Sequence, residues 1–267
     1  MKGKKIVSTL LALLLLTGVP VSALAAEWDI SKGDITVNAG SGGQTVTQGG
    51  GAAVVDSAPV IMGSSTDNTL TINAEKDQTA SVTLSGVNID VSGKGKAAVS
   101  TTGEGNVSIE LDGDSTLKSG EKHAGLEKNN GGRLTIADQD KNGKLTAEGG
   151  LNGAGIGGGN QRDGSNIIIT GGEIKATGGD YGAGIGGGLQ GKGKDITVSG
   201  AAKLKVQGGV EDDVDGAGAG IGDGGSRSES INDASPIPGA EVAPDISGLT
   251  TGRIEYYAPG ADMEKDK

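Results

Sequence analysis

The chain has 267 residues, 53 of which are glycine, and its formal net charge is −11. Cysteine and phenylalanine are absent and aromatic residues make up 1% of the chain, which excludes a disulfide-stabilised scaffold and a globular core built on large rings. The acidic balance argues against nucleic acid as a partner, because acidic surfaces repel the phosphate backbone.

Residues 1–25 have the three parts of a secretory signal peptide. Three lysines precede an apolar stretch, Ile6 to Leu16, and Ala23-Leu24-Ala25 forms a small-x-small cleavage site. The apolar stretch is too short for a spanning helix, so no membrane span is expected after cleavage. We therefore predict an extracellular protein, secreted or non-covalently associated with the cell surface.

Residues 26–81 are expected to form an N-terminal cap and irregular first coils. Their short alternating segments are less regular than those that follow: Ile35–Val37, Thr45–Thr47, Pro59–Ile61 and Leu70–Ile72. Trp28 is predicted to cover the open end of the core, because a terminal repeat differs from internal repeats.

Residues 82–225 repeat one pattern. An aliphatic strand is followed by a second strand, and in the last three coils the second strand ends in Gly-Gly and is followed by the phrase Gly-Ala-Gly-Ile-Gly. Such a period is typical of a solenoid, whose coils bury their apolar faces against one another. Aligned first strands begin at Val82, Val107, Leu134, Ile167 and Ile196.

Within each strand every second residue is apolar, which predicts one face turned into a core. The isoleucines of the three Gly-Ala-Gly-Ile-Gly phrases are predicted to form one buried column: Ile156, Ile185 and Ile221. These patterns predict an all-β, right-handed parallel β-helix with three short strands per coil and about five to seven coils.

Residues 226–267 leave the repeat. Ser226–Pro244 is polar and contains three prolines, which is typical of a linker. Arg253–Tyr257 alternates like one more strand, and a charged tail follows. We interpret the region as a linker and tail, or as the start of a further module.

A candidate calcium site lies in the connection after Leu134–Ile136. Asp138, Asp140 and Asn142 place oxygen ligands at alternate positions, as in the first half of a calcium loop. The second half does not match, because Gly149 stands where the bidentate Glu belongs. Calcium is thus the one candidate cofactor, and a polar connection between strands is the alternative.

A second candidate site lies beside the last two Gly-Ala-Gly-Ile-Gly phrases. Stacked coils lie about 4.8 Å apart, which would group Asp180 with Asp213 or Asp215 on one edge. Tyr181 adds an amphipathic ring next to Asp180. We predict these four residues as a cation or sugar-hydroxyl site, with solvated loop charge as the alternative.

No catalytic set is predicted. The chain has one histidine, His123, and no cysteine, and nothing in the sequence marks a partner for His123 in a Ser-His-acid arrangement. An enzyme of the polysaccharide lyase or glycoside hydrolase type remains an alternative. It would use the lysines predicted near the Asp180 edge: Lys175, Lys192, Lys194 and Lys205.

Four phrases carry a resemblance to a known group: Thr116–Gly120, His123–Leu126, Lys144–Ala147 and Gly182–Gly188. They resemble the Gly-rich β-helix repeats of secreted and wall-attached proteins of Gram-positive gut bacteria, often described as carbohydrate-binding or adhesin-like. The resemblance covers about Ile30 to Gly225 and implies a right-handed parallel β-helix.

It also implies a non-catalytic protein that binds an extracellular glycan or a cell-wall or host surface. Many members of that group end in an apolar sorting signal, whereas this chain ends in Met263–Lys267, so covalent wall attachment is not expected. A passive structural stalk or spacer is the second alternative.

Overall fold

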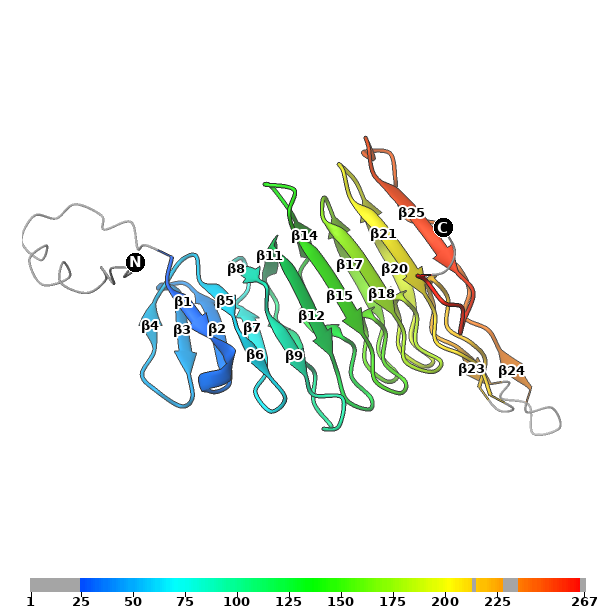
Figure 1. Ribbon diagram of the computed structural model, residues 1–267, viewed down its shortest axis with the longest axis horizontal. Coiled ribbons are helices and arrows are strands. Elements are labelled where there is room, and N and C mark those ends of the chain that lie inside the picture. The colour runs from blue at the N-terminus through cyan, green and yellow to red at the C-terminus, as the bar shows by residue number, and fades with distance from the viewer. Residues whose placement is uncertain (1–24, 213–214, 228–234, 265–267) are drawn as a thin grey trace, which may run out of the picture.

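The protein is a β-solenoid of about six turns (Figure 1). A computed structural model describes residues 25–212, 215–227 and 235–264, and in these ranges the only helix is a single 3-10 turn, Ile30–Lys32. The predicted right-handed parallel β-helix with three strands per coil is confirmed. The predicted signal peptide, apart from Ala25, lies outside the described residues.

Three long sheets run along the solenoid, and their strands pair with the equivalent strands of adjacent coils. Sheet A contains, in order, β1 (Glu27–Asp29), β5 (Val60–Met62), β8 (Thr79–Ser85), β11 (Asn106–Asp112), β14 (Leu134–Ala137), β17 (Gly164–Ile169) and β20 (Gly193–Val198). Sheet C contains β6 (Ser64–Ser65), β9 (Asn88–Asp90), β12 (Asp114–Lys118), β15 (Lys144–Glu148), β18 (Glu173–Thr177), β21 (Lys203–Gln207) and β25 (Arg253–Tyr257).

Sheet B forms the third side and continues into the N-terminal cap. It contains β4 (Val54–Val55), β3 (Gly43–Gln48), β2 (Ile35–Gly40), β7 (Leu70–Ala74), β10 (Val99–Gly103), β13 (Leu126–Lys128), β16 (Ile156–Gly157), β19 (Ile185–Gly186) and β22 (Ile221–Gly222). A small antiparallel pair, β23 (Ser226–Arg227) and β24 (Pro236–Ile237), lies near the C-terminal end.

Alternation within the strands turns every second side chain into the core, as predicted. In β17, Ile167 and Ile169 are fully buried, whereas Ile168 is partly exposed on the outer face. Sheet B pairs the isoleucines of the repeated phrase directly with one another, and each is fully buried: Ile156, Ile185 and Ile221. The predicted isoleucine column is confirmed.

One predicted register is wrong by two residues. The aligned strand starts set Val82 beside Val107, but Val82 pairs with Ile109, and Val107 pairs with Ala80. The reason is that β8 begins at Thr79, before the larger aliphatic residues that mark it in the sequence. A shift of two residues keeps each side chain on the same face, so the predicted core is unchanged.

Gly157 explains why the repeated phrase is rich in glycine. Its φ is +136°, and a Cβ at this position would lie 2.1 Å from the carbonyl oxygen of Gly186 in the next coil. Only glycine allows both this conformation and this approach. The phrase therefore forms a tight corner at which successive backbones stack.

The N-terminal end is closed by an antiparallel extension of sheet B, β2–β3–β4, and by β1. Trp28 of β1 packs against the core, and its indole Nε1 donates a hydrogen bond of 2.8 Å to Asp56 Oδ2. Asp56 is buried, and the Gln44 amide donates to its backbone carbonyl at 3.1 Å. Trp28 thus lies at the predicted end of the core.

At the other end, residues 235–264 of the predicted linker and tail pack against the last coil. As its alternation predicted, β25 is one more strand and pairs in parallel with β21. The Glu241 carboxylate accepts hydrogen bonds from the backbone N–H groups of Gly220 (2.6 Å) and Ile221 (3.1 Å) in sheet B. The backbone of Asp245 pairs with β20, so this segment pairs with the last strand that the repeats contribute to each long sheet: β20, β21 and β22.

Candidate functional site

A groove with a volume of about 390 Å³ lies on the outer face of sheet C, over β15, β18, β21 and β25. Outward side chains of these parallel strands meet in rows along the solenoid. The first row is Asp114, Lys144, Glu173, Lys203 and Arg253. The second row is Thr116, Thr146, Lys175, Lys205 and Glu255. The last four residues of each row line the depression over β15, β18, β21 and β25, which we call the sheet C groove.

Ion pairs hold several side chains of the sheet C groove in place. The Lys203 ammonium lies 2.9 Å from Glu173 Oε1, and this hydrogen bond lowers the pKa of the Glu173 carboxyl. Arg253 and the Tyr257 hydroxyl both donate to the Glu255 carboxylate, which lowers the pKa of Glu255. The groove therefore presents oriented donors and acceptors at a spacing set by the strands.

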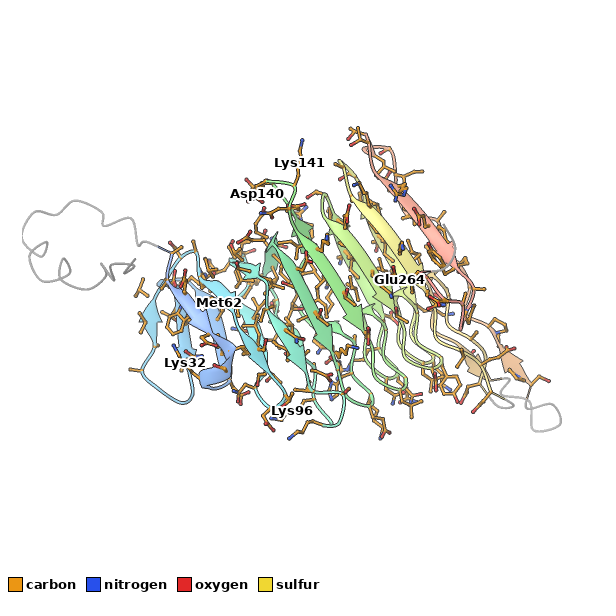
Figure 2. All side chains as sticks on the ribbon, viewed as in Figure 1. Lys32, Met62, Lys96, Asp140, Lys141 and Glu264 are labelled. Atoms are coloured by element: carbon orange, nitrogen blue, oxygen red, sulfur yellow. The ribbon has the colours of Figure 1, made fainter. Side chains whose placement is uncertain are left out.

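The C-terminal segment borders this groove. Lys205 Nζ donates to the Met263 carbonyl at 2.8 Å, and Met263 itself is buried. The side-chain amide of Gln207 donates to two further backbone carbonyls of the segment. Glu264 Oε1 lies 3.5 Å from Lys175 Nζ, and Figure 2 shows Glu264 over the strands of sheet C. The end of the described chain thus contacts the lysines of the groove.

A second depression of about 450 Å³ adjoins the first at the edge between sheets A and C. The two share Lys144, Glu173 and Lys203, and the second is also lined by Asp138 and Asn142. The sheet C groove was not predicted from the sequence. The only indication of the groove in the sequence is that the second strands carry charged residues at outward positions. These residues form one continuous surface only when the coils are stacked.

The predicted calcium ligands are only partly brought together. Oxygens of Asp138, Asp140 and Glu110 lie within 4.8 Å of one another, and Figure 2 shows Asp140 at the tip of this turn. Asn142 is not one of this group, and its side-chain amide donates a hydrogen bond of 3.0 Å to Asp112 Oδ1. Glu110 comes from the preceding coil and was missed in the sequence. These three carboxylates are the groups that could hold a divalent cation, and calcium binding stays a prediction.

The second predicted site gathers around Tyr181. The Tyr181 hydroxyl donates a hydrogen bond to Asp212, which raises the pKa of Tyr181 to about 12, and the charges of Asp180 and Asp215 act in the same direction. Asp213 lies outside the described residues. Sequence reasoning missed Asp212, the residue that holds the hydroxyl. Binding at this edge stays a prediction.

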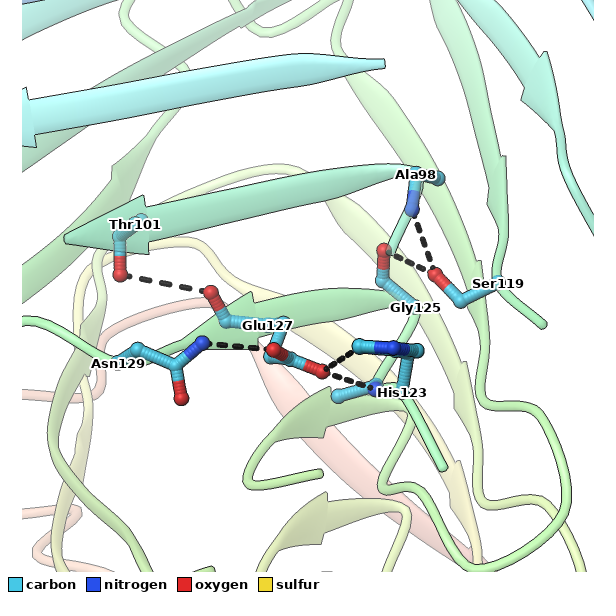
Figure 3. A network of polar contacts seen from close by, with 8 residues as sticks. Ala98, Thr101, Ser119, His123, Gly125, Glu127 and Asn129 are labelled. Atoms are coloured by element: carbon cyan, nitrogen blue, oxygen red, sulfur yellow. Dashed lines mark hydrogen bonds and ion pairs between the residues drawn. The ribbon is translucent and has the colours of Figure 1, made fainter. Parts of the chain in front are cut away.

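His123 has a partner that the sequence did not reveal. Its Nδ1 lies 2.8 Å from Glu127 Oε2, and Glu127 is 6% exposed (Figure 3). The Glu127 carboxylate also accepts hydrogen bonds from the Ala124 backbone N–H and the Asn129 amide. Glu127 pairs with Gly157, so side chains here fill the corner that glycine forms in later coils. We assign this network a structural role.

Comparison with known proteins finds no matching family model, no matching curated protein and no matching solved structure. In the part of the chain that the structure describes, no helix has the length and apolar character needed to cross a membrane.

Proposed function

We propose that this chain is a non-catalytic secreted or cell-surface protein of the Gly-rich β-helix type that binds carbohydrate in the sheet C groove. The observation that carries the proposal is the groove itself, about 390 Å³ in volume and lined by polar side chains from adjacent coils. Sugars expose hydroxyl groups that both donate and accept hydrogen bonds. A surface with oriented carboxylates, ammonium groups and hydroxyls is suited to them.

The regular spacing of the groove favours a polymer over a single sugar. The rows continue from coil to coil at about 4.8 Å, so neighbouring strands present polar side chains to successive parts of an extended ligand. Thr146 is partly exposed in the middle of the second row, between Thr116 and Lys175. A ligand chain that lies along this row contacts several coils at once.

A binding role fits the positions of the residues better than catalysis does. His123 is held by Glu127 at a corner of sheet B, whereas the groove lies on the outer face of sheet C. A lyase would need a base in the groove, and Lys175 and Lys205 are the residues that could serve. A passive stalk would need neither the groove nor its charges. Both alternatives are outcomes of the test below.

The test is isothermal titration calorimetry with a panel of neutral and acidic oligosaccharides against the full chain. We expect binding by the natural protein and its loss in Thr146→Trp, which places an indole in the groove. Thr135→Trp is the matched control, because Thr135 has the equivalent outward position in sheet A. It should bind as the natural protein does.

Two results would contradict this function. Equal binding by the natural protein and Thr146→Trp would place the site elsewhere, and no binding to any glycan, with the fold intact by circular dichroism, would favour the stalk. Release of unsaturated non-reducing ends from a bound polymer, lost in Lys175→Gln, would establish the lyase alternative instead.

A further inference from the structure

The charge of the sheet C groove is opposite to the charge of the molecule. The chain as a whole has a net charge of −11, but five cationic side chains and three carboxylates line the groove. The cations are Lys144, Lys175, Lys203, Lys205 and Arg253. The carboxylates are Glu173, Glu255 and Glu264. A local excess of positive charge on an acidic protein attracts anions to this one surface.

Like charges lie side by side in the groove. In register, Lys175 is the neighbour of Lys205 across β18 and β21, and Lys203 is the neighbour of Arg253 across β21 and β25. Paired strands are about 4.8 Å apart, and like charges at neighbouring positions destabilise a sheet. Toward the N-terminus the first row alternates in sign, from Asp114 to Lys144. The unfavourable pairs are thus confined to the end of the groove over the last strands.

A carboxylate of the chain already lies beside one of these pairs. Glu264 Oε1 is 3.5 Å from Lys175 Nζ, and the Glu264 side chain is 67% exposed. An exposed ion pair of this length contributes little to stability and is readily exchanged. The neighbouring Lys205 is contacted by the Met263 carbonyl from the same segment. The C-terminal segment therefore supplies a negative partner for Lys175, whereas Glu173 and Glu255 are paired with Lys203 and Arg253.

We propose that the ligand of the sheet C groove is a glycan that carries anionic groups, and that the Glu264 carboxylate occupies the anion position until the ligand displaces it. Lys175 and Lys205 contact the anionic group of the ligand, and Lys203 and Arg253 extend the positive surface to the next coil. This inference rests on the proposed carbohydrate binding and adds the chemical class of the ligand. Carboxylate, sulfate and phosphate groups share the required charge.

The experiment compares oligosaccharides of similar length by calorimetry in calcium-free buffer. The probes are alginate (carboxylate), dextran sulfate (sulfate), a phosphorylated mannan (phosphate) and a neutral β-glucan, with sugar-free polyphosphate as a further probe. At about 20 mM NaCl we expect at least one anionic glycan to bind about tenfold more tightly than the β-glucan, and the difference to shrink at about 300 mM NaCl. The anionic probe that binds best identifies the group.

Variants test the residues. Lys175→Gln/Lys205→Gln should lower the affinity for the best anionic glycan about tenfold, which corresponds to about 1.4 kcal/mol. It should lower the affinity for the neutral β-glucan much less, because that ligand has no anionic group for the two ammonium groups to attract. Lys94→Gln/Lys194→Gln is the matched control, since these exposed lysines form ion pairs with Asp67 and Asp163 outside the groove. Glu264→Gln should raise the affinity for the anionic glycan several-fold, because the competing carboxylate is lost.

The outcomes separate this inference from the proposed function. Equal affinity for anionic and neutral glycans would overturn the anionic ligand while carbohydrate binding stands. Polyphosphate binding as tight as that of the best glycan would also overturn it, because the groove would then recognise charge alone. Unchanged or lower affinity in Glu264→Gln would overturn the displacement by the ligand. If no glycan binds at all, the proposed function fails and this inference fails with it.

Discussion

At the scale of single residues, one buried lysine shows how the interior of the solenoid changes the pKa of an ionisable side chain. Lys128 lies in β13 and is 6% exposed, and its Nζ donates to the Asn130 carbonyl at 2.8 Å. Burial lowers the pKa of the Lys128 ammonium to about 8, because the charged form loses hydration. The unfolded chain holds this proton up to about pH 10.4. Between these two values the unfolded state binds more protons than the folded state.

Folding stability should therefore rise with pH in this window. We expect the free energy of unfolding of the natural protein, relative to Lys128→Met, to increase by about 1–3 kcal/mol between about pH 7 and pH 10.5. Urea unfolding at several pH values measures the difference. Lys76→Met, at an exposed lysine, is the control and should give no such increase. Parallel curves for the natural protein and Lys128→Met would contradict the expectation.

The backbone approach at Gly157 gives a second prediction. Gly157→Ala should lower the free energy of unfolding by about 2–4 kcal/mol, because the new methyl group meets the Gly186 carbonyl and the φ of +136° is strained for alanine. Gly93→Ala is the matched control. Gly93 is exposed, and a Cβ there has no atom within 4 Å, so its effect should stay within about 0.5 kcal/mol. Similar midpoints in urea for both variants would refute this account.

At the scale of elements, the ends of the sheets require protection. An uncovered parallel sheet presents unpaired N–H and C=O groups to other chains. The C-terminal segment pairs with the last repeat strand of all three sheets, and in sheet B a side chain substitutes for the next strand. There the Glu241 carboxylate accepts hydrogen bonds from the backbone N–H groups of Gly220 and Ile221. In the preceding coils the equivalent N–H groups donate to backbone carbonyls of the following coil.

Glu241→Ala should expose this edge. Loss of the acceptor leaves two backbone N–H groups without their partner, which is expected to cost about 1–3 kcal/mol of stability. The variant should also self-associate at concentrations where the natural protein does not, as measured by sedimentation velocity. Glu104→Ala removes an exposed acidic residue on a turn and should change neither property. A monodisperse, fully stable Glu241→Ala protein would show that the carboxylate is dispensable.

At the scale of the whole molecule, each coil depends on its neighbours. The few aliphatic side chains that one coil buries do not offset the conformational entropy lost when the residues of that coil become ordered. A single coil is therefore unstable alone, and stacking with its inter-coil hydrogen bonds makes the fold possible. The molecule behaves as a series of nearly equivalent units.

Removal of one complete coil should leave the fold intact. Deletion of residues 164–192 lets β20 take the place of β17, because Gly164 and Gly193 are register partners. We expect a β-rich circular dichroism spectrum and cooperative unfolding at a lower urea concentration. Deletion of residues 164–178 removes β17 and β18 but keeps β19, so the three sheets lose their common register. If this half-coil variant were as stable as the full-coil variant, the coil would not be the unit of folding.

Local sequence pattern was sufficient for the strands, the coil repeat and the column of Ile156, Ile185 and Ile221. Alternation and glycine placement act within a few residues, and a coil that returns to the same register stacks equivalent positions. The proximity of the Asp138 and Asp140 carboxylates could also be predicted, because both residues lie in one short connection. The strand start at Thr79 was missed, since a two-residue shift leaves the inward pattern unchanged.

Contacts between coils could be decided only by the tertiary structure. Glu110 beside Asp138 and Glu264 beside Lys175 each join residues far apart in the chain. Connections vary in length from coil to coil, so residue spacing does not show which outward side chains become neighbours. The core follows from a period of two within each strand, whereas the groove and its charge follow from how the coils are stacked.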